Sequence, residues 1–294
     1  MRQDSMYRYS SIGRRLDRRY PTNRAVMIIL PIAGLVAAGW SYFQGEDLGH
    51  AAFRFFGGAI VVFLGWALGR ELAPDNARAA FVSLLTAFAA YLAVQGESIT
   101  LMFAALMLIR VVNRSTGLPA RLTDSIAVTL LVCYTVYATG NRSVGAVAAI
   151  AFAFDAILWQ GRKVEWMFAA ACAAAADLIP VKQATSGSPP PPVPVIWLLT
   201  LIGVAWAILI LRTRILRSTC DATGEGMSAA RTRAAMLVGL LLAWQSILAG
   251  TSAAIAQASL VWAVLAGLLL GQLPSLSSAP SGSPETGTKP SGKS

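Results

Sequence analysis

Glu71 and Asp155 are acidic residues within hydrophobic stretches, and a separate polar stretch supplies Arg110, Asn113 and Arg114. Carboxylates can serve as general bases or metal ligands, and guanidinium groups match the geometry of a phosphate. Brought together, these side chains could form a head-group site for an anionic lipid or a polyprenyl phosphate. The alternative is structural, because the same acids and bases could pair with one another and close two loops with salt bridges.

Glu71 and Asp155 stand out because helices favour acids at their N-termini and bases at their C-termini. Asp75 obeys this rule, since it follows a helix-ending proline and can cap the next helix. Glu71 falls in the last turn of its hydrophobic segment, and Asp155 lies inside the corresponding end of another. Charged groups in membrane segments are costly and are usually paired or functional. We therefore expect Arg110 or Arg114 to pair with Glu71 or Asp155.

A second mismatch involves Arg54, a base near the start of a hydrophobic segment, and Asp177, an acid near the end of another. Both are expected at the membrane face opposite to that of Glu71. We predict an ion pair between Arg54 and Asp177, with Glu46 and Asp47 as alternative partners.

Other chemistry is poorly represented in the sequence. His50 is the single histidine, which disfavours most zinc, haem and Ser-His-Asp sites. The acids do not form the repeated Asp-rich motifs that would hold magnesium on a diphosphate, so prenyltransferase-type chemistry is not supported. We expect no metal site and no cofactor.

The elements that carry these residues are predicted to be transmembrane helices. The chain of 294 residues is 56% hydrophobic and 13% charged, whereas soluble domains are about 45–50% apolar and about 25% charged. A membrane helix needs about 20 predominantly apolar residues. Ten segments qualify, some of them short: 25–43, 51–69, 77–95, 98–112, 124–139, 144–160, 164–180, 194–212, 234–250 and 253–272. The last two form an almost continuous stretch, 234–272, that could be one helix or two.

The distribution of basic residues supports this all-α, polytopic transmembrane bundle of about ten spans. With a cytoplasmic N-terminus, all but three of the 24 Lys and Arg residues fall on the cytoplasmic side. The exceptions are Arg54, Arg142 and Lys182. Because cytoplasmic loops are enriched in Lys and Arg, we expect both termini to be cytoplasmic and the protein to be a multi-pass inner (plasma) membrane protein. The net charge of +10 then reflects topology, so no nucleic-acid partner is predicted.

The chain divides into five regions. Residues 1–24 form a basic cytoplasmic segment, either an amphipathic interfacial helix bound to anionic lipids or a solvated tail. Helices 1–7 occupy residues 25–180, a Pro-rich outer connector spans 181–193, and helices 8–10 occupy 194–273. Residues 274–294 have the composition of a disordered cytoplasmic tail.

Small residues indicate where these helices pack. The pairs Gly65/Gly69 and Gly267/Gly271 each permit close approach of two helix backbones. The alanine-rich segment 164–180 offers little bulk to lipid, and we expect it inside the bundle.

Three functions remain open, and the sequence does not decide whether the protein is an enzyme. The first is a carrier or translocator of a small apolar or amphipathic molecule, with Gln245 and Gln257 among few polar groups at the midplane. The second is a membrane enzyme acting on a lipid or polyprenyl phosphate at the cytoplasmic face. The third is a non-catalytic scaffold or accessory subunit, with a membrane protein partner or a second copy of the chain. An open pocket around Glu71 and Asp155 would favour the first two, and a closed network of salt bridges would favour the third.

Overall fold

The computed structural model describes residues 7, 9–14, 16–180 and 188–273, and most of these are helical. The described residues contain ten helices and no β-strand, apart from one isolated bridge between Thr219 and Gly226. The helices are α1 (Pro21–Phe43), α2 (Leu48–Leu72), α3 (Ala77–Ala93), α4 (Ile99–Asn113), α5 (Leu122–Thr139), α6 (Ser143–Ile157), α7 (Glu165–Leu178), α8 (Val193–Arg212), α9 (Ala229–Leu248) and α10 (Ser252–Gly271).

Each predicted hydrophobic segment corresponds to one helix, so the all-α prediction is confirmed. The stretch 234–272 falls into two helices, α9 and α10. Gly250 lies between them with φ of 67°, a conformation that glycine adopts without strain. The hydroxyl of Thr251 then caps α10 by accepting a hydrogen bond from the Ala254 amide at 3.3 Å.

Five helices, α1, α2, α5, α8 and α10, are long and apolar enough to cross a bilayer. They indicate a membrane protein. Helices α3, α4 and α6 are apolar but shorter, at 15 to 17 residues.

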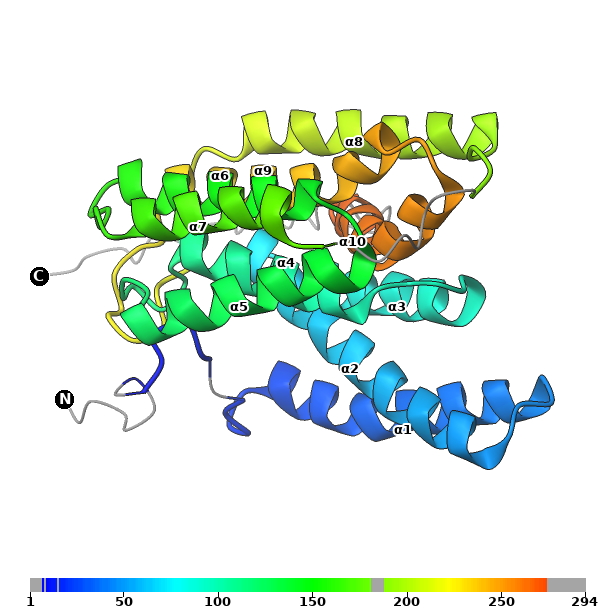
Figure 1. The fold of residues 1–294 in the computed structure, drawn as a ribbon. Coiled ribbons are helices and arrows are strands. Elements are labelled where there is room, and N and C mark those ends of the chain that lie inside the picture. Colours follow the sequence, from blue (N-terminus) through cyan, green and yellow to red (C-terminus); the bar gives the residue numbers. More distant parts are fainter. Residues whose placement is uncertain (1–6, 8, 15, 181–187, 274–294) are drawn as a thin grey trace, which may run out of the picture.

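The bundle is built around α4, which contacts α2, α5, α6, α9 and α10. From Leu108 to Asn113 every side chain of α4 is buried. Figure 1 shows α1 and the start of α2 as a hairpin that extends from one side of this body, with α8 along the other side. The C-terminal half of α4 therefore brings polar residues to the end of a helix that is surrounded by protein.

The two predicted glycine pairs pack against adjacent faces of α3. A Cβ atom at Gly69 would lie 2.6 Å from the Cα of Ala80, and one at Gly271 would lie 2.4 Å from the Cα of Ala79. Gly65 and Gly267 meet the same helix. These contacts hold α2, α3 and α10 at a distance that only small residues allow.

The prediction that the alanine-rich helix lies inside the bundle is wrong. α7 packs on α6 and α5 through a narrow face that includes Ala169 and Cys172, and its other face is exposed, including Trp166 and Met167. Small side chains let α7 lie close to α6, where a Cβ at Gly145 would meet the Cys172 carbonyl at 2.8 Å.

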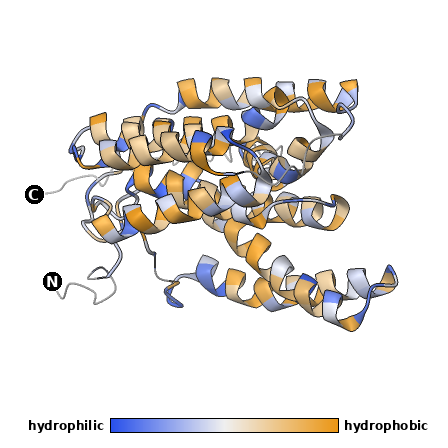
Figure 2. Cartoon of the chain, viewed as in Figure 1, coloured by the Kyte–Doolittle hydropathy of each residue, from blue (hydrophilic) through white to orange (hydrophobic). Residues whose placement is uncertain are grey.

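Hydrophobic residues cover the helix surfaces, and hydrophilic ones gather in the connecting segments (Figure 2). α8 shows this clearly, since it buries only Leu199, Gly203 and Trp206. A soluble protein rarely exposes apolar area on this scale, whereas a membrane helix presents it to lipid.

Hydrogen bonds group the connecting segments at two ends of the bundle. We call one the basic end; it contains residues 9–14 and 16–20 and the loops 73–76, 114–121, 158–164 and 213–228. The opposite end contains the loops 44–47, 94–98, 140–142 and 249–251. Contacts between Ser218 and Asp75 link loops at the basic end, and a contact between Ser98 and the Gln257 carbonyl links elements at the opposite end.

Candidate functional site

Glu71, at the C-terminal end of α2, is fully buried and is surrounded by donors from the protein itself. Its Oε1 atom accepts from Arg110 Nε at 3.1 Å and from Arg14 Nη1 at 3.2 Å. Its Oε2 atom accepts from Asn113 Nδ2 at 3.2 Å. The same Asn113 nitrogen donates to the Glu71 carbonyl at 3.0 Å, and the Thr232 hydroxyl holds the amide by donating to Asn113 Oδ1 at 2.7 Å.

Asp155, in the last turn of α6, is also fully buried and binds two guanidinium groups. Arg114 makes a bidentate contact, with Nε and Nη2 each 2.8 Å from a carboxylate oxygen. Arg231 Nη1 donates to Oδ1 at 2.7 Å. The predicted pairing of the inner acids with Arg110 and Arg114 is therefore confirmed, with Arg110 on Glu71 and Arg114 on Asp155.

The spacing of residues on α4 explains why it serves both acids. Arg110, Asn113 and Arg114 are three and four residues apart, which places them at one end of the helix within reach of both neighbours. Arg114 ends the helix in the left-handed conformation, with φ of 48°. α2 brings Glu71 to one side of this helix end and α6 brings Asp155 to another.

Two of these arginines also fix the loop that follows α6. Arg114 Nη1 donates to the Gln160 carbonyl, and Arg231 Nη2 donates to the Trp159 carbonyl, both at 2.8 Å. Gln160 itself has a left-handed backbone, with φ of 62°. The cations of the network thus satisfy backbone carbonyls as well as carboxylates.

The described part of the N-terminal segment packs on this network. The described residues 9–14 and 16–20 form no α-helix, and Ser11 and Ile12 among them are buried against the bundle. Residues 1–6, 8 and 15, which also belong to the segment predicted as an interfacial helix or a solvated tail, lie outside the described residues. Ser11 is buried, and its amide and hydroxyl donate to Asp124 Oδ2 at 2.9 and 2.8 Å. Arg14 bridges Glu71 and Asp221, with its Nε 2.5 Å from Asp221 Oδ2. We call residues 11–14 the N-terminal clasp.

Asp75 has a different role from the one predicted. The cap of α3 is Asn76, whose side chain accepts from the Ala79 amide at 3.0 Å. Asp75 instead accepts from the Arg217 amide at 2.9 Å and from the Ser218 amide and hydroxyl at 2.8 and 2.6 Å. Slight burial acts to raise the pKa of Asp75, but the Ser218 and Arg217 hydrogen bonds outweigh it and the net pKa is lowered.

At the opposite end, Arg54 pairs with Glu97, so the predicted pair with Asp177 is corrected. Arg54 Nη1 lies 2.8 Å from Glu97 Oε1, and Nη2 donates to the Tyr91 carbonyl at 2.6 Å. The guanidinium carbon also lies 3.8 Å from the centroid of the Tyr91 ring. Asp177 is exposed. Within the described chain Arg54 forms no salt bridge with Glu46 or Asp47, the alternative partners.

The midplane position predicted for the two glutamines is also wrong. Gln245 contacts Asn141 in the loop between α5 and α6, and Gln257 donates to the Thr139 carbonyl at 3.0 Å. Both therefore lie at the opposite end. Gln257, Arg54 and Thr100 line an opening there of about 320 Å³, which we call the outer pocket.

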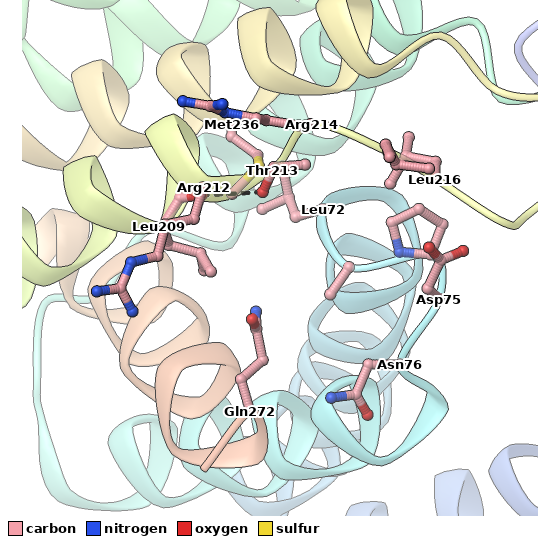
Figure 3. Close-up of a pocket in the computed structure, with 13 residues that line it drawn as sticks. Leu72, Asp75, Asn76, Leu209, Arg212, Thr213, Arg214, Leu216, Met236 and Gln272 are labelled. Atoms are coloured by element: carbon pink, nitrogen blue, oxygen red, sulfur yellow. Dashed lines mark hydrogen bonds between the residues drawn. The ribbon is translucent and has the colours of Figure 1, made fainter. Parts of the chain in front are cut away.

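A larger opening of about 480 Å³ lies at the basic end, among the ends of α2, α8 and α10 and the side of α9 (Figure 3). We call it the α8 groove. Leu72, Leu209 and Met236 supply apolar lining, and Arg212 and Arg214 lie at its rim. Glu71 and Asp155 are absent from its lining.

The geometry of the buried network is that of a closed structure. Glu71 and Asp155 have no exposed surface, and each is neutralised by two guanidinium groups of the chain. A third fully buried acid, Glu165, accepts from the Ser125 hydroxyl at 3.0 Å, while its Oε1 atom has no partner within the described residues. Nowhere in the described ranges do three or more His, Cys, Asp or Glu side chains come together as a metal site would require.

Comparison of the chain with models of protein families, with characterised proteins and with solved structures finds no match.

Proposed function

We propose that the protein is a multi-pass protein of the inner (plasma) membrane with ten spans, both termini and the basic end facing the cytoplasm. The five long apolar helices support membrane insertion. The concentration of Lys and Arg at one end supports the orientation, because positively charged loops are retained in the cytoplasm. The short helices α4 and α6 need no long apolar face, since protein surrounds much of their length.

We further propose that the protein acts as a non-catalytic scaffold or accessory subunit of a membrane complex. The observation that carries this proposal is the complete burial of Glu71 and Asp155, each held by two arginines. A general base needs access to a substrate proton within hydrogen-bond reach. Enclosed and neutralised side chains instead stabilise helix packing. Here their ion pairs and hydrogen bonds connect α2, α4, α6 and α9.

The test distinguishes a catalytic role from a structural one by dividing the activity in cells by the amount of protein in the membrane. Cells lacking the protein are complemented with Glu71→Gln or Asp155→Asn, and the rescue of the deletion phenotype is compared with the amount of protein in the membrane. A scaffold predicts rescue in proportion to abundance. Loss of rescue at normal abundance would overturn the proposal and favour an enzyme. Asp177→Asn, at an exposed position, is the control.

A second candidate is a carrier of a small amphipathic molecule, and the two openings at opposite ends of α2 favour it. The α8 groove includes Leu72, and the outer pocket includes Phe53 and Arg54. The carrier predicts that purified protein in vesicles accelerates movement of a fluorescent phospholipid between leaflets, measured by dithionite quenching. Gln257→Ala, in the outer pocket, should slow that movement. A rate equal to that of protein-free vesicles would contradict the carrier.

A further inference from the structure

The α8 groove differs from the buried network in having cations without carboxylate partners. Arg212 and Arg214 are exposed, and no salt bridge or side-chain hydrogen bond joins either one to another described residue. Asp75 is the one carboxylate among the described residues of the lining, and the backbone amides of Arg217 and Ser218 already donate to its two oxygens. The described lining residues therefore carry two guanidinium charges against one carboxylate, which leaves the groove a net positive charge.

The lining changes from polar to apolar along the groove. Arg212 ends α8, and Arg214 follows two residues later. Leu209 lies one turn earlier in α8, and Met236 lies about two turns inside α9. Figure 3 shows these residues around one opening, with the carboxamide of Gln272 directed into it and the guanidinium groups of Arg212 and Arg214 directed outward.

The depth of this arrangement matches a membrane interface. α8 is one of the five helices able to span a bilayer, so its final residue lies where hydrocarbon gives way to head groups. Arginine side chains at this depth attract anionic lipids, at about 1 kcal/mol for each residue. A volume of about 480 Å³ falls within the range of small-molecule sites, which is about 300–1,000 Å³.

We propose that the α8 groove binds an anionic phospholipid of the cytoplasmic leaflet. Its phosphate meets the guanidinium groups of Arg212 and Arg214 at the rim, and part of one acyl chain packs against Leu209 and Met236. Charge complementarity and depth carry the assignment, which uses the topology proposed above but does not depend on whether the protein is a scaffold or a carrier. The sequence predicted a lipid head-group site at Arg110 and Arg114, which are buried in the network. The site proposed here uses Arg212 and Arg214 instead.

The experiment measures lipid retained by the full chain purified in a non-ionic detergent, using native mass spectrometry and the thermal unfolding midpoint. Phosphatidylglycerol is compared with phosphatidylcholine of the same chains and with glycerol phosphate, which has the anion but no chain. We expect phosphatidylglycerol alone to be retained and to raise the unfolding midpoint. Equal retention of phosphatidylcholine would overturn the proposal, as would an equal effect of glycerol phosphate.

Charge-matched variants test the location. The double variant Arg212→Gln/Arg214→Gln should weaken phosphatidylglycerol binding about tenfold or more, since two interfacial arginines are lost. Arg78→Gln/Arg233→Gln removes the same charge from exposed positions at the basic end outside the groove, and it should bind as the unmodified chain does. Equal binding by both double variants would overturn the assignment.

A third variant guards against misfolding of the first. Leu216→Trp enlarges a partly exposed side chain in the lining and leaves every charge in place. It should lower phosphatidylglycerol retention by filling the groove, with the lipid-free unfolding midpoint unchanged. Unchanged retention in this variant would count against the groove as the binding site.

Discussion

At the scale of single residues, the signs of charges at helix ends identified the important side chains but missed some of their partners. Glu71 and Asp155 violate the dipole preference, and both form ion pairs in the structure. Arg231 was missed because the predicted helix began at 234. The observed α9 begins at Ala229, so Arg231 is a base in a first helical turn and fails the same test. An error in one boundary thus concealed half of the charge that binds Asp155.

Asp155→Asn should destabilise the protein strongly. The substitution leaves Arg114 and Arg231 with no compensating charge in a buried site, and breaking a buried pair in this way costs about 3–5 kcal/mol. Reversible unfolding in mixed micelles of detergent and SDS measures the change. Asp177→Asn is exposed and should change the unfolding free energy by less than about 0.5 kcal/mol. Equal effects of the two variants would contradict this account of the network.

Asp75 should make the loop 213–228 sensitive to acid. Its pKa is lowered from an ordinary value of 3.8 by hydrogen bonds that favour the charged carboxylate. This stabilisation is present above pH 3.8 and is lost as the pH falls through the lowered pKa. Cys220, which is buried in the same loop, should then react faster with dithiodipyridine, a reagent active in acid.

The control for this acid response is Asp75→Asn, which cannot ionise. It should label at a rate with no step in this pH range, while the unmodified chain shows a rise below pH 3.8. Labelling of Cys220→Ser subtracts the contribution of Cys133 and Cys172. A rise of the same size in Asp75→Asn would show that Asp75 does not control the loop.

At the scale of helices, hydrophobic segments and glycine pairs were predicted well, whereas helix exposure was not. Segment length and apolar content are local properties, and all ten segments became helices. Burial of α7 depended on its neighbours, which the sequence does not specify. Small residues in α7 proved to permit close contact along one face, with the other face left exposed.

Gly271→Ala should destabilise the contact between α10 and α3. The added methyl group would lie 2.4 Å from the Cα of Ala79, a distance that requires the helices to separate. We expect a loss of about 1–3 kcal/mol in unfolding free energy, as for other overpacked sites.

The matched control is Gly39→Ala in α1, where nothing lies within 4 Å of the added atom. Alanine is favoured over glycine within a helix by about 1 kcal/mol in water, so this variant should be neutral or stabilising. Equal destabilisation by the two substitutions would show that helix propensity, and not close packing, determines the cost.

At the scale of the whole molecule, the proposed topology makes the two ends of the bundle chemically distinguishable in cells. A single cysteine in place of Glu46, in an exposed loop at the opposite end, should react with an impermeant maleimide added outside intact cells. A cysteine in place of Arg78, exposed at the basic end, should react only after the cells are opened. The native cysteines are replaced by serine for this measurement. The reverse pattern would invert the topology.

The N-terminal clasp was not predictable because its partners are distant in sequence. Ser11 contacts Asp124 and Thr116, more than 100 residues away, and Arg14 contacts Asp221 across 207 residues. An arginine-rich segment is typical of a signal for membrane orientation. Its composition therefore does not indicate that Arg14 packs against Glu71 and Asp221. The opposing charges at Glu71 and Asp221 become its partners only once the helices are assembled.

The clasp also imposes an order on biosynthesis. Residues 11–14 are synthesised before any of the ten helices, whereas Asp221 and Arg231 follow after eight of the helices have been made. Until then Glu71 lacks the tie from Arg14 to the loop 213–228, and Asp155 has Arg114 as its one arginine partner among the described residues. A nascent chain interrupted before residue 221 therefore has both Glu71 and Asp155 paired, but it lacks the contacts that tie the N-terminal clasp to the loop 213–228 and α6 to α9.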